Sequence, residues 1–315
     1  MNCRLLFSTH VIFVCLAYSA RADESGFAVT GYLPDYRVAN VVTDRFSIIT
    51  DLVYFGIQPP ADGRLPASPV DASVLRKLKA IKVDANCKLL LCVGGWERSD
   101  GFPALAMSES ARQRFVSSLL SYCRKNGFDG VDYDWEHPKN AQELTAYGRL
   151  LSETAMAFHE RQLLVSVAQA GWQNLGKDAY AAVDRVHLMS YDHEFPQATF
   201  EKSTSDVDRL IGWGCPAEKI AMGLPFYGRN EANEARTYGE LVGQNAIDPR
   251  IDNIDGFAFN GTATINRKVK FAKTRGLSGV MIWELGQDSA RESVSLLRTI
   301  RRQLRASTSR QRTGK

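Results

Sequence analysis

The chain of 315 residues has no long apolar run after its first 22 residues, and no internal repeat, low-complexity linker or proline-rich hinge. Without a run of roughly 20 apolar residues, no membrane-spanning helix is expected there. The lack of linkers favours one domain. The six cysteines form no Cys-x-x-Cys pair and no cluster with histidine, so we expect no metal ion and no other cofactor.

The one apolar stretch lies at the N-terminus and has the form of a secretory signal. Arg4 precedes the apolar run Val11 to Ala20, and Ala20-Arg21-Ala22 is a small-x-small cleavage site. Residues 1–22 are therefore predicted to be a cleaved signal peptide, and the product to be secreted or periplasmic. The alternative, an uncleaved membrane anchor, would need a longer run than these roughly ten apolar residues.

Four cysteines remain after such cleavage: Cys87, Cys92, Cys123 and Cys215. Cys87 and Cys92 bracket an extended segment about 16 Å long, too far for a bridge between them. We expect buried thiols, with a disulfide between more distant segments as the open alternative.

Basic residues gather at the C-terminal end. The last 18 residues contain seven Lys or Arg and no acid, whereas the rest of the cleaved chain is negative overall. A nucleic-acid partner would require a basic body as well, so none is expected. Residues 306–315 are predicted to form a disordered basic tail, and the protein to be a monomer that is free of the membrane after cleavage.

Apolar strand-like runs alternate with amphipathic helical patterns, eight of each. Eight such units in about 280 residues are typical of a (β/α)8 TIM barrel, predicted as a single domain over residues 23–305. A doubly wound open sheet is the alternative, but no Gly-x-Gly-x-x-Gly follows the first strand. The predicted strands are Ala28–Tyr32, Ile49–Ile57, Lys88–Gly94, Gly130–Trp135, Leu163–Ala168, Arg185–Ser190, Lys219–Leu224 and Gly279–Trp283.

The fourth predicted strand carries an acidic ladder. Asp132, Asp134 and Glu136 alternate with apolar residues, so all three carboxyl groups should lie on one strand face. Their crowding separates their pKa values, so that one group can be protonated while another is ionised. Glycoside cleavage needs such an acid and anion. A solvated acidic edge strand is the alternative.

Other polar and aromatic residues fall where strands end, which in a barrel is the edge that forms the active site. Aromatic faces can stack on pyranose rings, and polar groups can bind their hydroxyls. The residues concerned are Tyr32, Gly94-Gly95-Trp96, Tyr191-Asp192, Tyr227-Gly228-Arg229 and Trp283.

Together these motifs resemble glycoside hydrolase family 18, the chitinases and their relatives, over nearly all of the cleaved chain. The motifs that carry the resemblance, in chain order, are Gly31-Tyr32, Gly94-Gly95-Trp96, the acidic ladder, Met189-Ser190-Tyr191-Asp192, Gly223 to Arg229, and Trp283-Glu284. In that family the 2-acetamido group of the substrate acts as the nucleophile.

The resemblance implies a role for each site residue. Glu136 would be the general acid and base, Asp134 would orient the acetamido group, and Asp132 would tune the shared proton. Tyr191 would bind the acetamido carbonyl, with Asp192 in support. The substrate-binding residues would be Tyr32, Phe55, Gly95, Trp96, Met189, Tyr227, Arg229 and Trp283.

Some of these residues have plainer interpretations. Trp283 and Met189 could be barrel core, Arg229 could pair with a loop acid, and Trp96 could be an exposed aromatic residue without a ligand.

Two departures from the family pattern stand out. Cys92 replaces the serine that the family usually has, which would weaken a hydrogen bond near Asp132. The stretch Asn230–Gly261 is too short for the full α+β insertion subdomain of many chitinases, which implies one low wall and an open cleft.

The first functional hypothesis is a secreted hydrolase of β-1,4 links after N-acetylglucosamine, in chitin or chitooligosaccharides, by substrate-assisted retaining catalysis. The second is a hydrolase of peptidoglycan or N-glycans, which carry the same acetamido group. The third is a non-catalytic chitin-binding lectin on the same fold, although such proteins typically lose the acid that Glu136 provides here.

Overall fold

The computed structural model describes residues 26–243 and 248–313, with side chains as far as residue 306. The predicted signal peptide, residues 1–22, lies outside the described residues.

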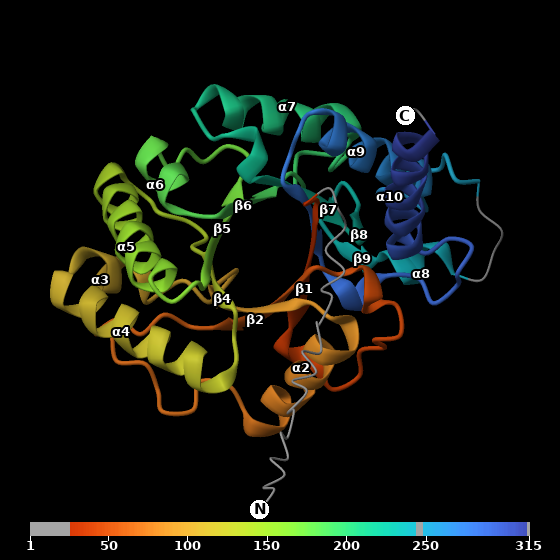
Figure 1. Ribbon diagram of the computed structural model, residues 1–315. Coiled ribbons are helices and arrows are strands. Elements are labelled where there is room, and N and C mark those ends of the chain that lie inside the picture. The colour runs from red at the N-terminus through yellow and green to blue at the C-terminus, as the bar shows by residue number, and fades with distance from the viewer. Residues whose placement is uncertain (1–25, 244–247, 314–315) are drawn as a thin grey trace, which may run out of the picture.

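Eight parallel strands close into a barrel in the order β1-β12-β7-β6-β5-β4-β3-β2, and helices surround it (Figure 1). The predicted (β/α)8 TIM barrel is therefore confirmed. The barrel strands are β1 (Ala28–Pro34), β2 (Asp51–Ile57), β3 (Lys88–Gly94), β4 (Gly130–Asp134), β5 (Leu164–Ala170), β6 (Arg185–Met189), β7 (Ile220–Pro225) and β12 (Gly279–Trp283).

Each predicted strand overlaps its observed strand with small differences at the ends. The apolar runs mark the strands well because both faces of a barrel strand are buried, as all five residues of β4 are. Backbone hydrogen bonds between neighbouring strands determine where each strand ends, and the pairing of β4 with β3 stops at Asp134. Glu136 therefore lies two residues beyond the strand.

Several of the connecting helices begin at side chains that cap their first turns. Asp71 accepts from the backbone N–H groups of Ser73 and Val74, and Ser108, Asn140 and Thr199 cap later helices in the same way. The helices are α1 (Asp35–Val38), α2 (Ala72–Ala85), α3 (Phe102–Met107), α4 (Glu109–Asn126), α5 (Ala141–His159), α6 (Lys177–Ala182), α7 (Phe200–Gly212), α8 (Tyr238–Val242), α9 (Thr262–Thr274) and α10 (Leu296–Thr313), with 3-10 turns η1 (Phe46–Ile48), η2 (Ala217–Lys219) and η3 (Leu285–Gln287).

The segment after β7 forms a small four-stranded sheet in the order β10-β11-β8-β9, with α8 beside it. Its strands are β8 (Tyr227–Arg229), β9 (Ala235–Thr237), β10 (Asn253–Ile254) and β11 (Phe257–Ala258). Strands of two or three residues are too short to show a hydrophobic period, which explains why Asn230–Gly261 has none. Within the described residues this sheet stands where a full insertion subdomain would be, as the sequence predicts.

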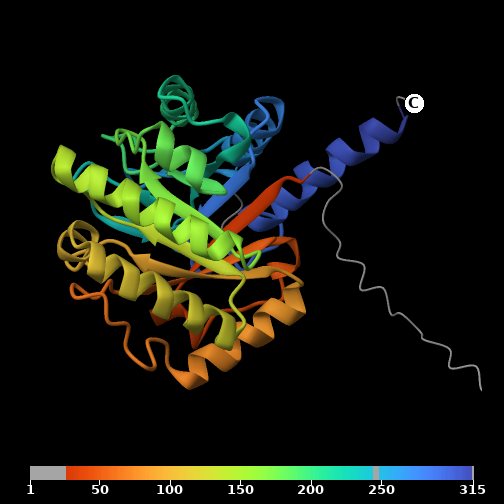
Figure 2. The same ribbon diagram turned by 60° about the vertical axis from the view of Figure 1, so that its left-hand side comes forward.

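Helix α10 packs on α9 and then extends away from the barrel (Figure 2). Leu296, Leu297, Ile300 and Leu304 are its buried apolar residues. The helix continues to Thr313, which differs from the disordered tail predicted from residue 306. A helix that is already nucleated by a packed segment extends at little cost per residue.

The four cysteines Cys87, Cys92, Cys123 and Cys215 are buried and free, in agreement with the prediction of buried thiols. Over the part of the chain that the structure describes, no helix is long and apolar enough to cross a membrane. The same part holds no group of three side chains suited to bind a metal ion.

Two hydrophobic clusters hold the barrel, one between strands and helices and one inside it. In the outer cluster Phe102 of α3 stacks on Trp135 with ring centroids 5.1 Å apart and an interplanar angle of 15°. Its ring also contacts Tyr133 of β4 and Tyr147 of α5. The apolar face of β4 is thus supported from outside by an aromatic group that centres on Phe102.

Replacing Phe102 by alanine should lower the free energy of unfolding by about 3–5 kcal/mol, because it leaves a cavity at the centre of this group. Urea denaturation measures the change. The matched control is Met107→Ala on the same helix, whose side chain is exposed and whose loss should stay within about 0.5 kcal/mol. Equal effects of the two substitutions would contradict this account of the outer cluster.

Candidate functional site

Strand β4 directs the acidic ladder into the barrel. Asp132 and Asp134 are buried, and the side chain of Glu136 is 15% exposed. Residues of β1, β5 and β6 contact Asp132 in the barrel interior. The predicted common face therefore exists, and it is the inner face.

Asp132 lies in a polar network at the bottom of the ladder. The hydroxyl of Tyr32 donates to its Oδ2 at 2.7 Å, and that of Ser166 donates to its Oδ1 at 2.6 Å. His187 Nδ1 lies 3.0 Å from Oδ1 and 2.9 Å from the Tyr32 hydroxyl. We did not predict Ser166 or His187 from the sequence, although each is a polar residue within an apolar strand.

Asp134 is the middle rung and has fewer partners. Its pKa is raised well above the usual range by burial, and further by the charges of Glu136 and Asp132. Its Oδ1 has no hydrogen-bond partner among the described residues. Since buried acceptors are normally satisfied, this oxygen is suited to bind a donor of a ligand.

Glu136 stands at the top of the ladder. Burial raises its pKa to about 7, with the charge of Asp192 as a second cause, while a hydrogen bond to the Trp96 backbone opposes the rise. Its backbone N–H donates to Ser99 Oγ at 3.0 Å, and this hydroxyl donates to the Gly95 carbonyl at 3.0 Å. Ser99, which the sequence did not single out, thus fixes the backbone of Glu136 to the neighbouring loop.

The loop after β3 requires glycine. Gly94 and Gly95 have φ angles of +100° and +115°, a region that residues with a side chain rarely adopt. A Cβ on Gly95 would come within 2.1 Å of the Phe55 ring. The Gly95 N–H donates to the Asp134 carbonyl at 2.6 Å, so the tight turn ties this loop to the acidic strand.

Tyr191 and Asp192 follow β6 and face the ladder from the other side. The Tyr191 hydroxyl donates to Met281 Sδ at 3.7 Å, a weak acceptor. Asp192 Oδ1 accepts from the Tyr227 hydroxyl at 2.7 Å and from Arg229 Nε at 2.5 Å. Arg229 therefore pairs with Asp192, which is itself one of the predicted site residues.

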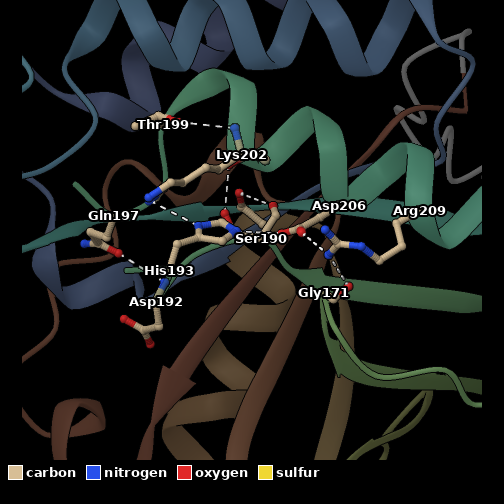
Figure 3. Close-up of polar contacts among 12 residues, drawn as sticks. Gly171, Ser190, Asp192, His193, Gln197, Thr199, Lys202, Asp206 and Arg209 are labelled. Carbon is tan, nitrogen blue, oxygen red and sulfur yellow. Dashed lines mark hydrogen bonds and ion pairs between the residues drawn. The ribbon is translucent and has the colours of Figure 1, made fainter. Parts of the chain in front are cut away.

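The loop that carries Asp192 is anchored to α7 and to the segment just before it. The Asp192 backbone N–H donates to Gln197 Oε1 at 3.2 Å, and His193 Nε2 lies 2.8 Å from Asp206 Oδ2 (Figure 3). Lys202 Nζ donates to the carbonyl of Glu194 at 2.6 Å. These contacts hold the Asp192 backbone in its left-handed conformation, at a φ of +56°.

Most of the predicted binding residues form the cluster inside the barrel. Trp283 lies edge-on to Phe55, with ring centroids 4.8 Å apart, and tilted against Tyr32 at 5.7 Å. Met189 and Tyr227 belong to the same cluster. Trp96 lies apart from it and is 66% exposed.

Cys92 also lies in the inner cluster, and it is the residue of β3 that pairs with Asp132 of β4. Burial raises the pKa of its thiol well above the usual range, and the charges of Asp132 and Asp134 raise it further. The thiol is therefore neutral at physiological pH. The cysteine is accommodated in the closed barrel without loss of the strand pairing.

The chemistry of this arrangement follows from the two upper carboxyl groups. A group with a pKa near 7 can give a proton and take it back at neutral pH. A second carboxyl group beside it can stabilise a positive charge when it is ionised. The site is thus suited to acid–base catalysis with a cationic intermediate.

Comparison with known proteins gives the family. Residues 9–288 match the model of glycosyl hydrolases family 18. The chain belongs to this family. The resemblance stated from its motifs is confirmed.

Among curated relatives, Chitinase 1 of Aphanocladium album is 29% identical in an alignment of 278 residues, with a coverage of 69% of this chain and 66% of that protein. Probable chitinase 2 of Drosophila melanogaster is 27% identical over 64% of this chain and 56% of its own length. The chain therefore spans somewhat less than two thirds of these relatives.

Among solved structures, the GH18 chitinase ChiB from the chitin utilization locus of Flavobacterium johnsoniae has a TM-score of 0.78 at 25% identity, over 88% of this chain and 94% of that one. A chitinase from Bacteroides thetaiotaomicron has a TM-score of 0.80 at 23% identity, over 88% and 96% of the two chains. The second likeness supports the fold.

Replacing Asp192 by asparagine should lower the pKa of Glu136, because it removes the negative charge that disfavours ionisation of that group. A pH titration of the labelled Glu136 carboxyl carbon by NMR measures the shift without reference to activity. Asp208→Asn, the same change at an exposed position of α7, is the control. An unchanged or raised pKa in the Asp192 variant would show that this charge does not act on Glu136.

Proposed function

We propose that this protein hydrolyses β-1,4 links after N-acetylglucosamine in chitin or chitooligosaccharides, by substrate-assisted retaining catalysis. The pair Asp134 and Glu136 carries the proposal. It places a carboxyl group with a pKa of about 7 next to a buried carboxyl group with one unpaired oxygen. Curated relatives named chitinases support the substrate class.

In this mechanism Glu136 protonates the glycosidic oxygen as the bond breaks. Its raised pKa keeps part of the population protonated at neutral pH, as a general acid requires. The acetamido oxygen of the sugar attacks the anomeric carbon and closes an oxazolinium ring. Glu136, now ionised, then takes a proton from a water molecule as the water oxygen attacks the anomeric carbon. The bond from this carbon to the acetamido oxygen breaks, which opens the ring and leaves the product with its β configuration.

Asp134 and Tyr191 hold the acetamido group. The unpaired Oδ1 of Asp134 accepts from the acetamido N–H and stabilises the cationic ring. The Tyr191 hydroxyl, whose partner within the described chain is a thioether, donates to the acetamido carbonyl. Asp132 influences the proton of Asp134 from below, since its charge acts on that group.

The inner cluster binds the sugar. Trp283 forms the floor at the cleavage point, with Tyr32 and Phe55 around it. Asp192 and Arg229 form an ion pair at the edge of the site. The solved structure of a class V chitinase mutant from Cycas revoluta holds (GlcNAc)3, which supports an oligosaccharide ligand for this fold.

We further propose export through residues 1–22, with cleavage, and function outside the cytoplasm as a monomer. The motif Ala20-Arg21-Ala22 supports the cleavage.

Replacing Glu136 by glutamine should lower kcat about 10² to 10⁴-fold, because an amide cannot supply the proton. Oligosaccharide binding should persist. Hydrolysis of a fluorogenic chitobioside measures kcat, and calorimetry measures oligosaccharide binding. Glu160→Gln, the same change at an exposed position after α5, should keep full activity. A Glu136 variant with more than about a tenth of the activity would exclude this residue as the general acid.

The mechanism predicts a specific inhibitor and a stereochemical outcome. A thiazoline analogue of an N-acetylglucosamine oligomer mimics the oxazolinium ring and should inhibit competitively, since analogues of high-energy states bind far tighter than substrates. Proton NMR of fresh product should show the β anomer first. An α anomer as the first product, or cleavage of cellulose at a similar rate, would overturn both mechanism and substrate class.

A further inference from the structure

Two exposed tryptophans stand on the two flanks of Glu136. Trp96 and Trp172 are 66% and 63% exposed. Trp96, Glu136 and Trp172 each lie two residues beyond the C-terminal end of a strand, and those strands, β3, β4 and β5, are neighbours in the barrel. Sites that bind small molecules are lined largely by hydrophobic and aromatic side chains, so these two indoles beside the acid are candidate contacts for a ligand. The family motifs include Trp96, but Trp172 belongs to none of them.

Trp172 continues the inward row of β5. Ser166 faces the interior, since it donates to Asp132, and Ala168 and Ala170 follow it at intervals of two residues. The two alanines are small, so this row occupies little space below the indole. In β4 the same spacing leads from Asp132 to Glu136, so both rows end at the same edge of the barrel.

His137 connects the indole with the acid. It follows Glu136 in the chain, and its Nε2 lies 3.6 Å from Glu136 Oε2. Its ring meets Trp172 edge-on, with centroids 4.8 Å apart and an interplanar angle of 66°. The indole is therefore one side chain away from the carboxyl group that acts on the glycosidic bond.

The backbone next to Trp172 is held by α7. Arg209 donates to the Gly171 carbonyl at 2.8 Å and to Asp206 Oδ1 at 2.8 Å (Figure 3). A Cβ on Gly171 would come within 2.4 Å of the Asp206 carboxyl group, so the chain passes close to this acid. An indole on such a fixed backbone loses less conformational freedom when it binds a ligand.

We propose that Trp172, backed by His137, is a stacking platform for a pyranose ring of the substrate, on the flank of Glu136 opposite Trp96. This inference rests on the proposed function and adds a residue that sets chain-length preference. An oligosaccharide that reaches both tryptophans gains a contact that a disaccharide cannot make. The ring is recognised by its apolar face, which stacks on the indole.

The test compares substrates of increasing length. Trp172→Ala should lower kcat/KM for the N-acetylglucosamine hexamer about tenfold, a typical loss for one well-placed interface tryptophan. Activity on the fluorogenic chitobioside should stay within about twofold of wild type. Trp172→Phe keeps a ring and should retain most of the activity on the hexamer. Met156→Ala, at an equally exposed site on α5, is the control and should change neither rate.

A second measurement needs no substitution at Trp172. In the Glu136→Gln protein, which should bind but not cut, oxidative footprinting by mass spectrometry should show protection of Trp172 by the hexamer and not by the disaccharide. Equal protection of Trp172 with both, or none, would overturn the inference, and this readout remains if Trp172→Ala does not fold.

The outcomes separate the two proposals. A wild-type protein that cuts none of these substrates would refute the proposed function. A wild-type protein that cuts them all, with a Trp172→Ala loss that is equal for every length or absent, would refute the platform alone. An equal loss at every length would indicate a structural role through His137.

Discussion

The burial of two carboxyl groups on the inner face of β4, with a third two residues beyond its end, is the constraint on which the rest of this molecule depends. Charge in a closed barrel interior is costly unless donors meet it. Tyr32, Ser166 and His187 approach Asp132 from three other strands, so the barrel must close correctly for that cost to be offset. Asp134 receives no comparable set of donors, and the site keeps an oxygen without a partner. A buried oxygen without a partner destabilises the protein when no ligand is bound, and it favours a ligand that donates a hydrogen bond to it.

The outer side of β4 supplies the support that the inner side lacks. Phe102, Tyr133 and Trp135 pack there without a charged group among them, and the Tyr133 hydroxyl is paired with Thr154 Oγ1 at 2.8 Å. Strand β4 therefore has an apolar face that stabilises the fold and an acidic face that carries the carboxyl groups of the site. This division explains why the period of two in the sequence was informative. The alternation that is typical of a strand also places the packing residues on one face and the carboxyl groups on the other.

The sequence predicts those parts of the structure that a single segment can encode. The apolar runs located all eight barrel strands, because burial on both faces makes each run nearly continuous. The ladder of Asp132, Asp134 and Glu136 was visible because these residues alternate with apolar ones. Ser166, His187 and Ser99 were missed because their importance comes from register between strands and from a loop contact, which periodicity along one segment does not report. The short strands β8 to β11 were missed because two or three residues cannot show a period.

The two hydrophobic clusters also separate stability from chemistry. The outer cluster contains most of the buried apolar side chains and lies between strands and helices. The inner cluster is small and combines the aromatic residues around the acidic ladder with aliphatic side chains, methionines and Cys92. A substitution in the outer cluster removes packing that every strand shares, whereas one in the inner cluster changes the walls of the site and leaves the surrounding layer in place. The fold can thus accept unusual residues inside the barrel, as it does at Cys92 and His187, provided that hydrogen bonds or neutral forms are available to them. Specificity can then change through residues just beyond the strand ends, where side chains such as Trp172 leave the packed layers altogether.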